Sequence, residues 1–440
     1  MKSFFLIVLF GVLGFSVHAQ NEVVKDTTDV KLLEIERLKY KQQPGLALAA
    51  SKIFFSDKRY SISGFGEFNS VPVQTGVNRN AGDLELYYTG LYRYATFFGY
   101  RITDKLIWNS EFQIELLNDR DQEVRTEIVL EAFVDYLYKD YVKARVGFFP
   151  LTIGYVNNND EPVMFYSVNR SEVERIIVPS SWIEFGAMFY GAINDDWSYA
   201  LGITQGLNAA NYIDGTWIRQ GREIRLDMPR TIAVNPQLNY NGIENLELSA
   251  SGYFGHSGKG NEVLVNGAVE RVDARIDLGS AYAKYDWKDF RFVAVGTYGR
   301  LSDTEKIFVL TQNEEGEGGQ VIGEEVYGYL FELGWDILPL LRKGKTISDR
   351  KNAFVEHRKM KLPLFARFER LNTHHSINNE LLMYSGSATQ KDLRILTAGI
   401  NFNTRENIVL KGNYQYRING YEGDPNPINH VVEFGVGFIF

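Results

Sequence analysis

The stretch KLIWNSEFQIELL, residues 105–117, decides the fold class of this chain. Apolar side chains occupy alternate positions along it, and polar or charged side chains occupy the positions between them. One face presents Leu106, Trp108, Phe112, Ile114 and Leu116, and the other presents Asn109, Glu111, Gln113 and Glu115. Because successive side chains of a β-strand point to opposite faces, this alternation predicts a strand with one apolar and one charged face.

The same two-residue period recurs about sixteen times between residue 60 and the C-terminus. Each repeat is close to the roughly 9–11 residues that a tilted strand needs to cross a bilayer. The predicted strands begin near Tyr60, Leu84, Leu106, Ile128, Val142, Ile183, Trp197, Ile232, Leu246, Ile276, Phe290, Val326, Leu364, Arg394, Ile408 and Val431. A soluble β-sandwich also alternates, so alternation alone does not identify the surrounding solvent.

The connections between the strands indicate that a membrane surrounds them. Short turns, such as residues 102–105 and 139–141, alternate with long connections, such as residues 118–127 and 207–230. Outer-membrane barrels have short turns at one rim and long loops at the other. The final strand, VVEFGVGFIF, also ends on the aromatic residue Phe440, as the insertion signals of barrel precursors do. We therefore predict an all-β, transmembrane, antiparallel β-barrel over residues 58–440, with long extracellular loops and short periplasmic turns.

The composition agrees with a barrel that encloses water. The chain has 440 residues, a net charge of -8, 14% aromatic residues and no cysteine, and its mean hydropathy is -0.22. The absence of cysteine excludes disulfides and thiolate chemistry, and the acidic balance argues against a nucleic-acid partner. Charged residues at mid-strand, such as Glu111, Glu131 and Arg145, must face a lumen because lipid tolerates them poorly. Barrels of about sixteen strands enclose an aqueous channel.

The N-terminus predicts export. Residues 1–19 are typical of a secretory signal peptide, with Lys2 before an apolar stretch and small residues before Gln20. Residues 20–57 then form a periplasmic lead-in, and VKLLEIERLKY within it suggests a short amphipathic helix. This lead-in is either a tether or a small oligomerisation or plug element. We expect the mature chain in the outer membrane, in contact with its lipid.

Two connections are candidates for a selectivity site. Residues 150–182 contain apolar residues such as Phe165, Ile176 and Ile177, which are unusual in a solvated loop, so we expect this loop to fold inward and constrict the channel. The next connection contains IRQGREIR, whose arginines either bind phosphate, sulfate or carboxylate or form salt bridges in a solvated loop. The candidate pore and selectivity residues are Arg93, Lys143, Arg145, Arg170, Arg175, Arg219, Arg222, Arg225, Arg367, Glu369, Lys411 and Arg417.

Four motifs resemble one known family. They are KARVGFFPLTIG at residues 143–154, NRSEVERIIVPSSWIEFGAMFYG at 169–191, QGREIR at 220–225 and LFARFE at 364–369. Together they resemble the phosphate-selective porins (the porin O and P family), in particular its divergent branch of unassigned substrate. The resemblance implies a homotrimer of sixteen-stranded barrels that passes small anions and nutrients. The chain lacks the lumenal ladder of Arg and Lys of the phosphate-specific members, so phosphate selectivity is not implied.

One connection breaks the alternation of short and long. Residues 338–361, LPLLRKGKTISDRKNAFVEHRKMK, lie on the expected short-turn side and are strongly basic. They are a docking element for an acidic partner, a solvated insertion, or a miscounted pair of strands.

The sequence therefore predicts a water-filled channel for passive or weakly selective diffusion of small hydrophilic solutes, including anions. It predicts no catalytic residue, cofactor or metal. A structural or partner-binding barrel is the alternative. A hydrolase is disfavoured because the histidines after the signal peptide lie in or beside predicted loops, and none shares a predicted strand face with a serine that it could activate.

Overall fold

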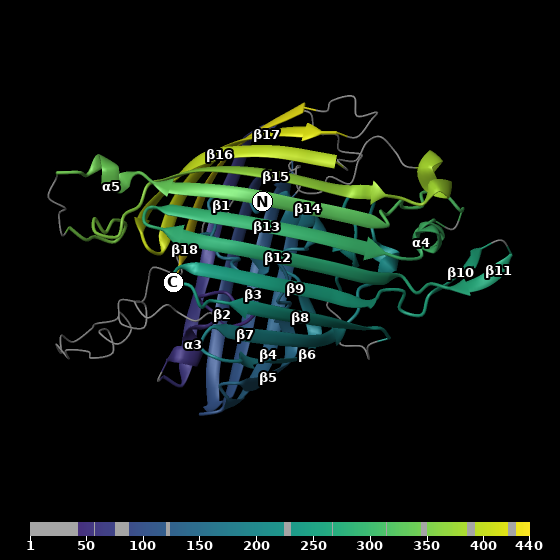
Figure 1. The fold of residues 1–440 in the computed structure, drawn as a ribbon, viewed down its shortest axis with the longest axis horizontal. Coiled ribbons are helices and arrows are strands. Elements are labelled where there is room, and N and C mark those ends of the chain that lie inside the picture. Colours follow the sequence, from purple (N-terminus) through teal and green to yellow (C-terminus); the bar gives the residue numbers. More distant parts are fainter. Residues whose placement is uncertain are drawn as a thin grey trace, which may run out of the picture. The chain divides into compact units, whose positions relative to one another are not determined.

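Sixteen antiparallel strands close into one barrel in the computed structural model, with β1 paired to β18 (Figure 1). The structure describes residues 43–56, 58–74, 88–119, 124–223, 230–265, 267–313, 315–344, 350–384, 392–420 and 428–440. The predicted signal peptide, most of the lead-in and Arg225 lie outside these residues. Each barrel strand pairs with its neighbours in chain order, so closure leaves no free sheet edge.

The barrel strands are β1 (Tyr60–Gln74), β2 (Tyr88–Thr103), β3 (Leu106–Asp119), β4 (Val124–Lys139), β5 (Val142–Pro150), β6 (Ile183–Ala192), β7 (Trp197–Gln205), β8 (Ile232–Tyr240), β9 (Leu246–His256), β12 (Arg275–Trp287), β13 (Phe290–Leu301), β14 (Glu325–Asp336), β15 (Pro363–Ser376), β16 (Asp392–Arg405), β17 (Ile408–Asn419) and β18 (Ile428–Ile439). Every predicted strand start lies within four residues of an observed one. The predicted all-β transmembrane barrel is confirmed.

The shorter elements are not part of the barrel wall. They are α3 (Lys52–Phe55), η1 (Val156–Asn158), η2 (Val173–Ile177), η3 (Ala209–Asn211), η4 (Arg219–Gly221), the hairpin β10 (Glu262–Val265) and β11 (Ala268–Arg271), α4 (Thr304–Leu310), α5 (Leu338–Leu341) and η5 (Asn379–Tyr384). Within the described residues, no helix is long and apolar enough to cross a membrane.

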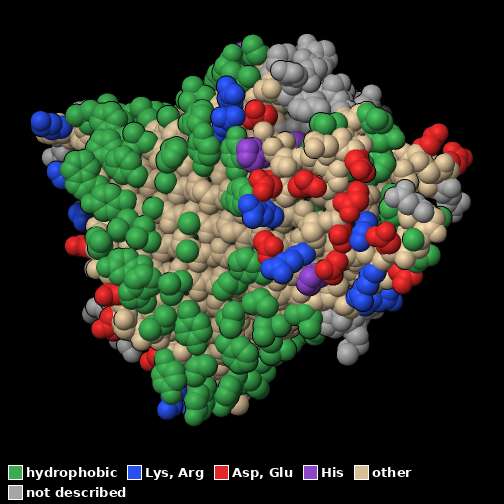
Figure 2. Space-filling view, turned by 45° about the vertical axis from the view of Figure 1, so that its right-hand side comes forward, with side chains coloured by type: hydrophobic (Ala, Val, Ile, Leu, Met, Phe, Trp, Pro, Cys, Tyr) green, Lys and Arg blue, Asp and Glu red, His purple; other side chains and the backbone are tan. Residues whose placement is uncertain are grey.

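The two faces of the wall differ as the alternation predicts. On β3, Trp108 and Phe112 are exposed on the outside, whereas Asn109 and Glu111 are buried on the inside. Hydrophobic side chains cover much of the outer wall in Figure 2, and charged side chains gather toward the end that carries the long loops. The outward aromatic residues at the short-turn end include Tyr60, Tyr100, Trp108, Tyr138, Tyr141, Trp197, Trp287 and Trp335. Such a girdle is typical of a membrane–water boundary.

The basic connection at the short-turn end is an insertion and not a missed pair of strands. Strands β14 and β15 pair directly with each other from Asp336↔Pro363 onward, so the barrel closes without it. The insertion contains α5 and folds back on the turn between β16 and β17, where Arg405 Nη1 donates to the carbonyl oxygens of Asn352 and Ala353 at 3.0 and 3.1 Å. In Figure 1, α5 lies at the opposite end of the barrel from β10 and β11.

Candidate functional site: the lumen

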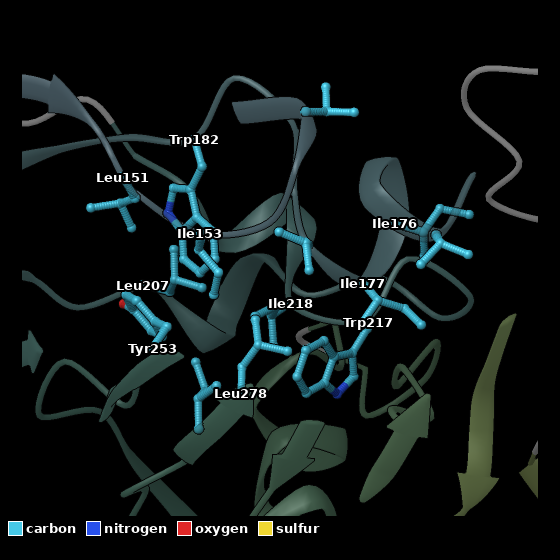
Figure 3. Close-up of a cluster of buried hydrophobic side chains, with 14 of the residues drawn as sticks. Leu151, Ile153, Ile176, Ile177, Trp182, Leu207, Trp217, Ile218, Tyr253 and Leu278 are labelled. Atoms are coloured by element: carbon cyan, nitrogen blue, oxygen red, sulfur yellow. The ribbon is translucent and has the colours of Figure 1, made fainter. Parts of the chain in front are cut away.

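The connection after β5 folds into the barrel, and we call residues 151–182 the inward loop. Its side chains are mostly buried, and Leu151, Ile153 and Trp182 are fully so. Figure 3 shows these three beside Tyr253 and Leu207, and the ring centroids of Trp182 and Tyr253 are 4.5 Å apart. Burying this apolar surface stabilises the inward position, since each large side chain contributes roughly 1.5–3 kcal/mol. The apolar residues of this connection are therefore buried and not solvated.

Polar contacts fix the other side of the inward loop to β15 and β17. Lys411 Nζ donates to the carbonyl oxygens of Phe165 and Ser167 at 2.8 and 2.9 Å. Arg367 Nη1 donates to Ser167 Oγ at 2.6 Å. A buried ammonium or guanidinium group needs such partners, because burial without them carries a large desolvation cost. Arg367 and Lys411 thus hold the loop to the wall.

The helical turn η2 of the inward loop is held in the same way. Glu369 Oε2 accepts a hydrogen bond from the backbone N–H of Glu172 at 2.8 Å. Arg417 Nη1 pairs with the Glu172 carboxylate at 2.9 Å, and Arg175 Nε donates to the same carboxylate at 2.9 Å. Arg175 and Arg417 together lower the pKa of Glu172 despite its burial. Glu172 is therefore an ionised hub that joins the loop to β17.

A cavity of about 260 Å³ lies between the inward loop, the turn η4 and the wall, and we call it the arginine vestibule. Its charged lining residues are Arg93, Arg170, Arg175, Arg219, Arg222, Arg417, Glu67, Glu115, Glu172, Glu223 and Glu433. Six candidate residues from four separate parts of the sequence thus line one cavity. Its size is near the lower end of the roughly 300–1,000 Å³ of small-molecule sites.

Ion pairs fix one side of the arginine vestibule. Arg93 Nε lies 3.1 Å from Glu67 Oε1, and Arg93 Nη1 lies 3.2 Å from Asp160 Oδ1. Arg170 also pairs with Asp160. Burial raises the pKa of Asp160 to about 6, although Arg93 opposes the change. These pairs connect β1 and β2 to the inward loop.

Near Ser180 and Ser181, neutral oxygens accept hydrogen bonds from two guanidinium groups of the vestibule, of which Arg170 is also paired with Asp160. Arg222 Nη1 donates to the carbonyl oxygen of Ser180 at 2.6 Å, and Arg170 Nη1 donates to the hydroxyls of Ser180 and Ser181 at 3.3 Å. Burial, followed by repulsion from Arg222, lowers the pKa of Arg219 to about 9, so Arg219 is still charged near neutral pH.

Residues 43–56, the end of the expected lead-in, lie inside the barrel, and we call them the N-terminal strap. Inward-facing side chains of the wall hold its backbone. Asn109 Nδ2 donates to the carbonyl oxygen of Ala50 at 3.0 Å, and Ser63 Oγ donates to that of Ala49 at 2.7 Å. Arg145 Nη1 donates to the carbonyl oxygen of Pro44 at 2.8 Å. The strap therefore fills part of the lumen toward the short-turn end.

Glu161 connects the strap to the inward loop. Its carboxyl oxygens accept hydrogen bonds from the backbone N–H groups of Leu48 and Ala49 at 3.0 and 2.7 Å. The side chain is 0% exposed. Burial raises the pKa of Glu161 to about 7, and the two N–H groups lower it by a smaller amount. One carboxyl group thus links the two segments that occupy the lumen.

The passage between the vestibule and the strap is narrow. A pocket of about 20 Å³ lies there, with room for about one water molecule. It shares Val129, Ser181 and Ile183 with the vestibule, and the strap residues Gly45 and Ala47 close its other side. Among the described residues, the cavity at the vestibule is thus much larger than the pocket where the inward loop meets the strap.

The two remaining described candidates lie outside the vestibule. Arg145 Nε pairs with Asp135 Oδ1 at 3.1 Å, and Tyr190 donates its hydroxyl to the same carboxylate at 2.7 Å. Lys143 Nζ lies 5.8 Å from the centre of the Tyr190 ring. Arg145 thus supports the strap through its bond to Pro44 and is buried beneath it.

Sequence reasoning did not select the loop residues that organise this lumen, namely Asp160, Glu161, Ser180 and Ser181. A strand residue reveals its direction through the two-residue period, but a loop residue has no period. The available signal was the density of polar residues within an otherwise apolar loop. In the part of the chain that is described, no group of three or more His, Cys, Asp or Glu is arranged to hold a metal ion.

Comparisons with known proteins place this architecture among outer-membrane porins and channels. No family model matches the chain. An uncharacterized protein of Aquifex aeolicus is 28% identical over 385 residues, which cover 85% of this chain and 79% of that protein. The outer membrane channel DcaP of Acinetobacter baumannii has a TM-score of 0.50 at 11% identity, over 87% of this chain and 97% of that one. OprB of Pseudomonas putida has a TM-score of 0.49 at 11% identity, over 87% and 95%. At this identity, the likeness to DcaP shows the fold.

Proposed function

We propose that the chain is an outer-membrane channel for small hydrophilic solutes and that its arginine vestibule prefers anions. Residues 1–19 then serve as the signal peptide, the long loops face the exterior and the short turns face the periplasm. The observation that carries the proposal is the convergence of six arginines on one water-accessible cavity inside a closed transmembrane barrel. A guanidinium can replace part of the hydration shell of a carboxylate or phosphate with two parallel hydrogen bonds.

The size and charge of the vestibule define the solute class. A cavity of about 260 Å³ suits a small ion or metabolite. The acidic residues of the lining are engaged with arginines at Glu67 and Glu172, whereas Arg170 and Arg222 also face the neutral oxygens of Ser180 and Ser181. This arrangement favours moderate anion preference over exclusive phosphate selectivity. A homotrimer, as in the phosphate-selective porins that the motifs resemble, completes the proposal.

Planar-bilayer recording tests this function directly. The purified chain should produce stepwise conductance, and its reversal potential in a salt gradient should indicate anion preference. Replacing Arg170 and Arg222 with Gln should shift the reversal potential toward that of cations. The matched control is Arg300→Gln, because Arg300 is exposed beside Glu325 at the end of β13, away from the vestibule. If the wild type conducts but the reversal potential of the double variant is unchanged, the anion preference is refuted and the channel function is not.

One observation favours the partner-binding barrel as a second candidate, because the strap and the inward loop together leave only a pocket of about 20 Å³ below the vestibule. If neither the wild-type protein nor a variant without the strap conducts, the result would support this candidate and exclude the channel.

A further inference from the structure

We propose that the basic insertion at the short-turn end binds anionic phospholipid headgroups of the adjacent membrane leaflet. The contacting groups are five exposed basic residues, Lys343, Arg350, Lys351, Arg358 and Lys361, which we call the basic patch. The proposal depends on the membrane-spanning barrel and not on what the lumen conducts.

The charge of the insertion is strongly one-sided. Residues 337–362 contain eight Lys and Arg residues against Asp349 and Glu356, which gives a net charge of +6 in a chain of net charge -8. The short turns on either side carry both signs, as in Lys288 with Asp289 and Arg405 with Glu406. The insertion therefore creates a local positive potential that these two neighbouring turns do not have.

The insertion is folded, so its charges have fixed positions. Arg342 Nη1 donates to the carbonyl oxygen of His357 at 2.7 Å and ties the two arms of the insertion together. The backbone N–H of Glu356 donates to the carbonyl oxygen of Thr404 at 2.9 Å, and that of Lys361 donates to Asn403 at 3.0 Å. These bonds attach the insertion to the rim of β16.

Within the described part of the insertion, Glu356 pairs with Lys351 and with Arg405 of β16, and Lys359 pairs with Glu406 of the adjoining turn. Glu356 lies 3.4 Å from both Lys351 Nζ and Arg405 Nη2. The Lys351 side chain in its pair is still 62% exposed. Exposed pairs of this kind are weak, so a stronger external anion can replace the internal partner.

Exposed apolar residues favour a lipid surface over a soluble acidic protein. Leu340, Leu341 and Phe354 are 57%, 52% and 73% exposed. The helix α5 begins at Leu338, three residues after Trp335, whose ring stacks on Phe290 within the aromatic girdle. These leucines therefore follow, within a few residues of the chain, a side chain that lies at the membrane–water boundary. Basic side chains combined with apolar ones at that boundary are typical of elements that bind anionic headgroups.

The test uses the full chain in phosphatidylcholine vesicles with a trace of spin-labelled phosphatidylglycerol or spin-labelled phosphatidylcholine. The fraction of motionally restricted label reports which lipid the protein prefers. We expect a preference for phosphatidylglycerol that weakens at high salt. Replacing Lys343, Lys351, Arg358 and Lys361 with Gln should reduce this preference by at least about fivefold, the effect of one basic residue near an anionic surface.

The matched control replaces four exposed arginines at the long-loop end, Arg230, Arg271, Arg300 and Arg394, with Gln. It changes the net charge equally and should leave the preference unchanged if the label is confined to the short-turn leaflet. Equal preferences in the wild type and the patch variant would overturn the proposal. Binding of soluble polyglutamate that falls in the patch variant, with an unchanged lipid preference, would also overturn it and indicate an acidic protein partner.

Discussion

Replacing Glu161 with Ala should release the N-terminal strap from the lumen. Glu161 accepts the backbone N–H groups of Leu48 and Ala49, and Ala provides no acceptor in its place. In the released strap, water satisfies both groups. The substitution therefore destabilises the seated state selectively.

The expected size follows from these two hydrogen bonds. A buried donor that loses its partner costs about 1–3 kcal/mol, so two donors cost about 3 kcal/mol at a conservative value. At about 1.4 kcal/mol for each factor of ten, the released population rises roughly 100-fold. At pH 6.5, below its pKa of about 7, Glu161 is largely neutral. Because little negative charge is lost at this pH, the difference in strap release between the wild type and Glu161→Ala reflects mainly the two lost hydrogen bonds.

A single introduced cysteine can measure this release, because the chain contains none of its own. Ala49 is 1% exposed, so the thiol of Ala49→Cys is protected from a maleimide while the strap is seated. When opening and closing are fast, the labelling rate follows the open population. We expect labelling at pH 6.5 to accelerate roughly 100-fold when Glu161→Ala is added. Glu161→Gln, which keeps one amide oxygen as acceptor, should give an intermediate rate.

The control is Glu317→Ala, because Glu317 is an exposed acidic residue in the connection between β13 and β14, at the long-loop end. It should leave the labelling rate unchanged. The reasoning is refuted if Ala49→Cys is labelled equally fast with and without Glu161→Ala. An equal rate would mean that Glu161 does not hold the strap.

Three further predictions concern the inward loop and the wall. Burial raises the pKa of Asp160 to about 6 and those of Glu161 and Glu174 to about 7. Between their ordinary and raised pKa values, these three carboxyl groups are protonated in the packed loop but ionised in a hydrated loop. Loop packing should therefore lose stability as the pH rises from about 5 to 8, and single-channel conductance should be larger at pH 8; a flat or opposite pH profile would contradict this sign. Lys411→Met removes two hydrogen bonds to the inward loop, of about 1.5–3 kcal/mol each, and should increase conductance, whereas Lys288→Met at an exposed turn should not. Leu130→Arg on the lipid face of β4 should lower the free energy of unfolding in vesicles by about 2–4 kcal/mol, measured by denaturant titration, and a smaller loss of stability than that caused by Leu130→Ala would contradict its placement.

The sequence by itself determined the barrel. The two-residue period is a local property of each strand, so KLIWNSEFQIELL reveals its two faces without any knowledge of its neighbours. The boundaries followed as well, since β3, β5 and β13 begin at the predicted residues Leu106, Val142 and Phe290. The inward course of residues 151–182 was also predictable, because a run of apolar residues requires burial.

Only the tertiary structure decided how the lumen is filled. Lys411 and Phe165 are 246 positions apart, and closure of the barrel brings them together. Similarly, Arg145 was predicted as a pore residue, but the strap covers it, and no pattern within the strap indicates this. The direction of a side chain is encoded locally, whereas its partner depends on which segments occupy the same enclosed space. For this reason the sequence selected arginines that face the lumen, and only the fold separated those that line the vestibule from those that anchor the segments inside it.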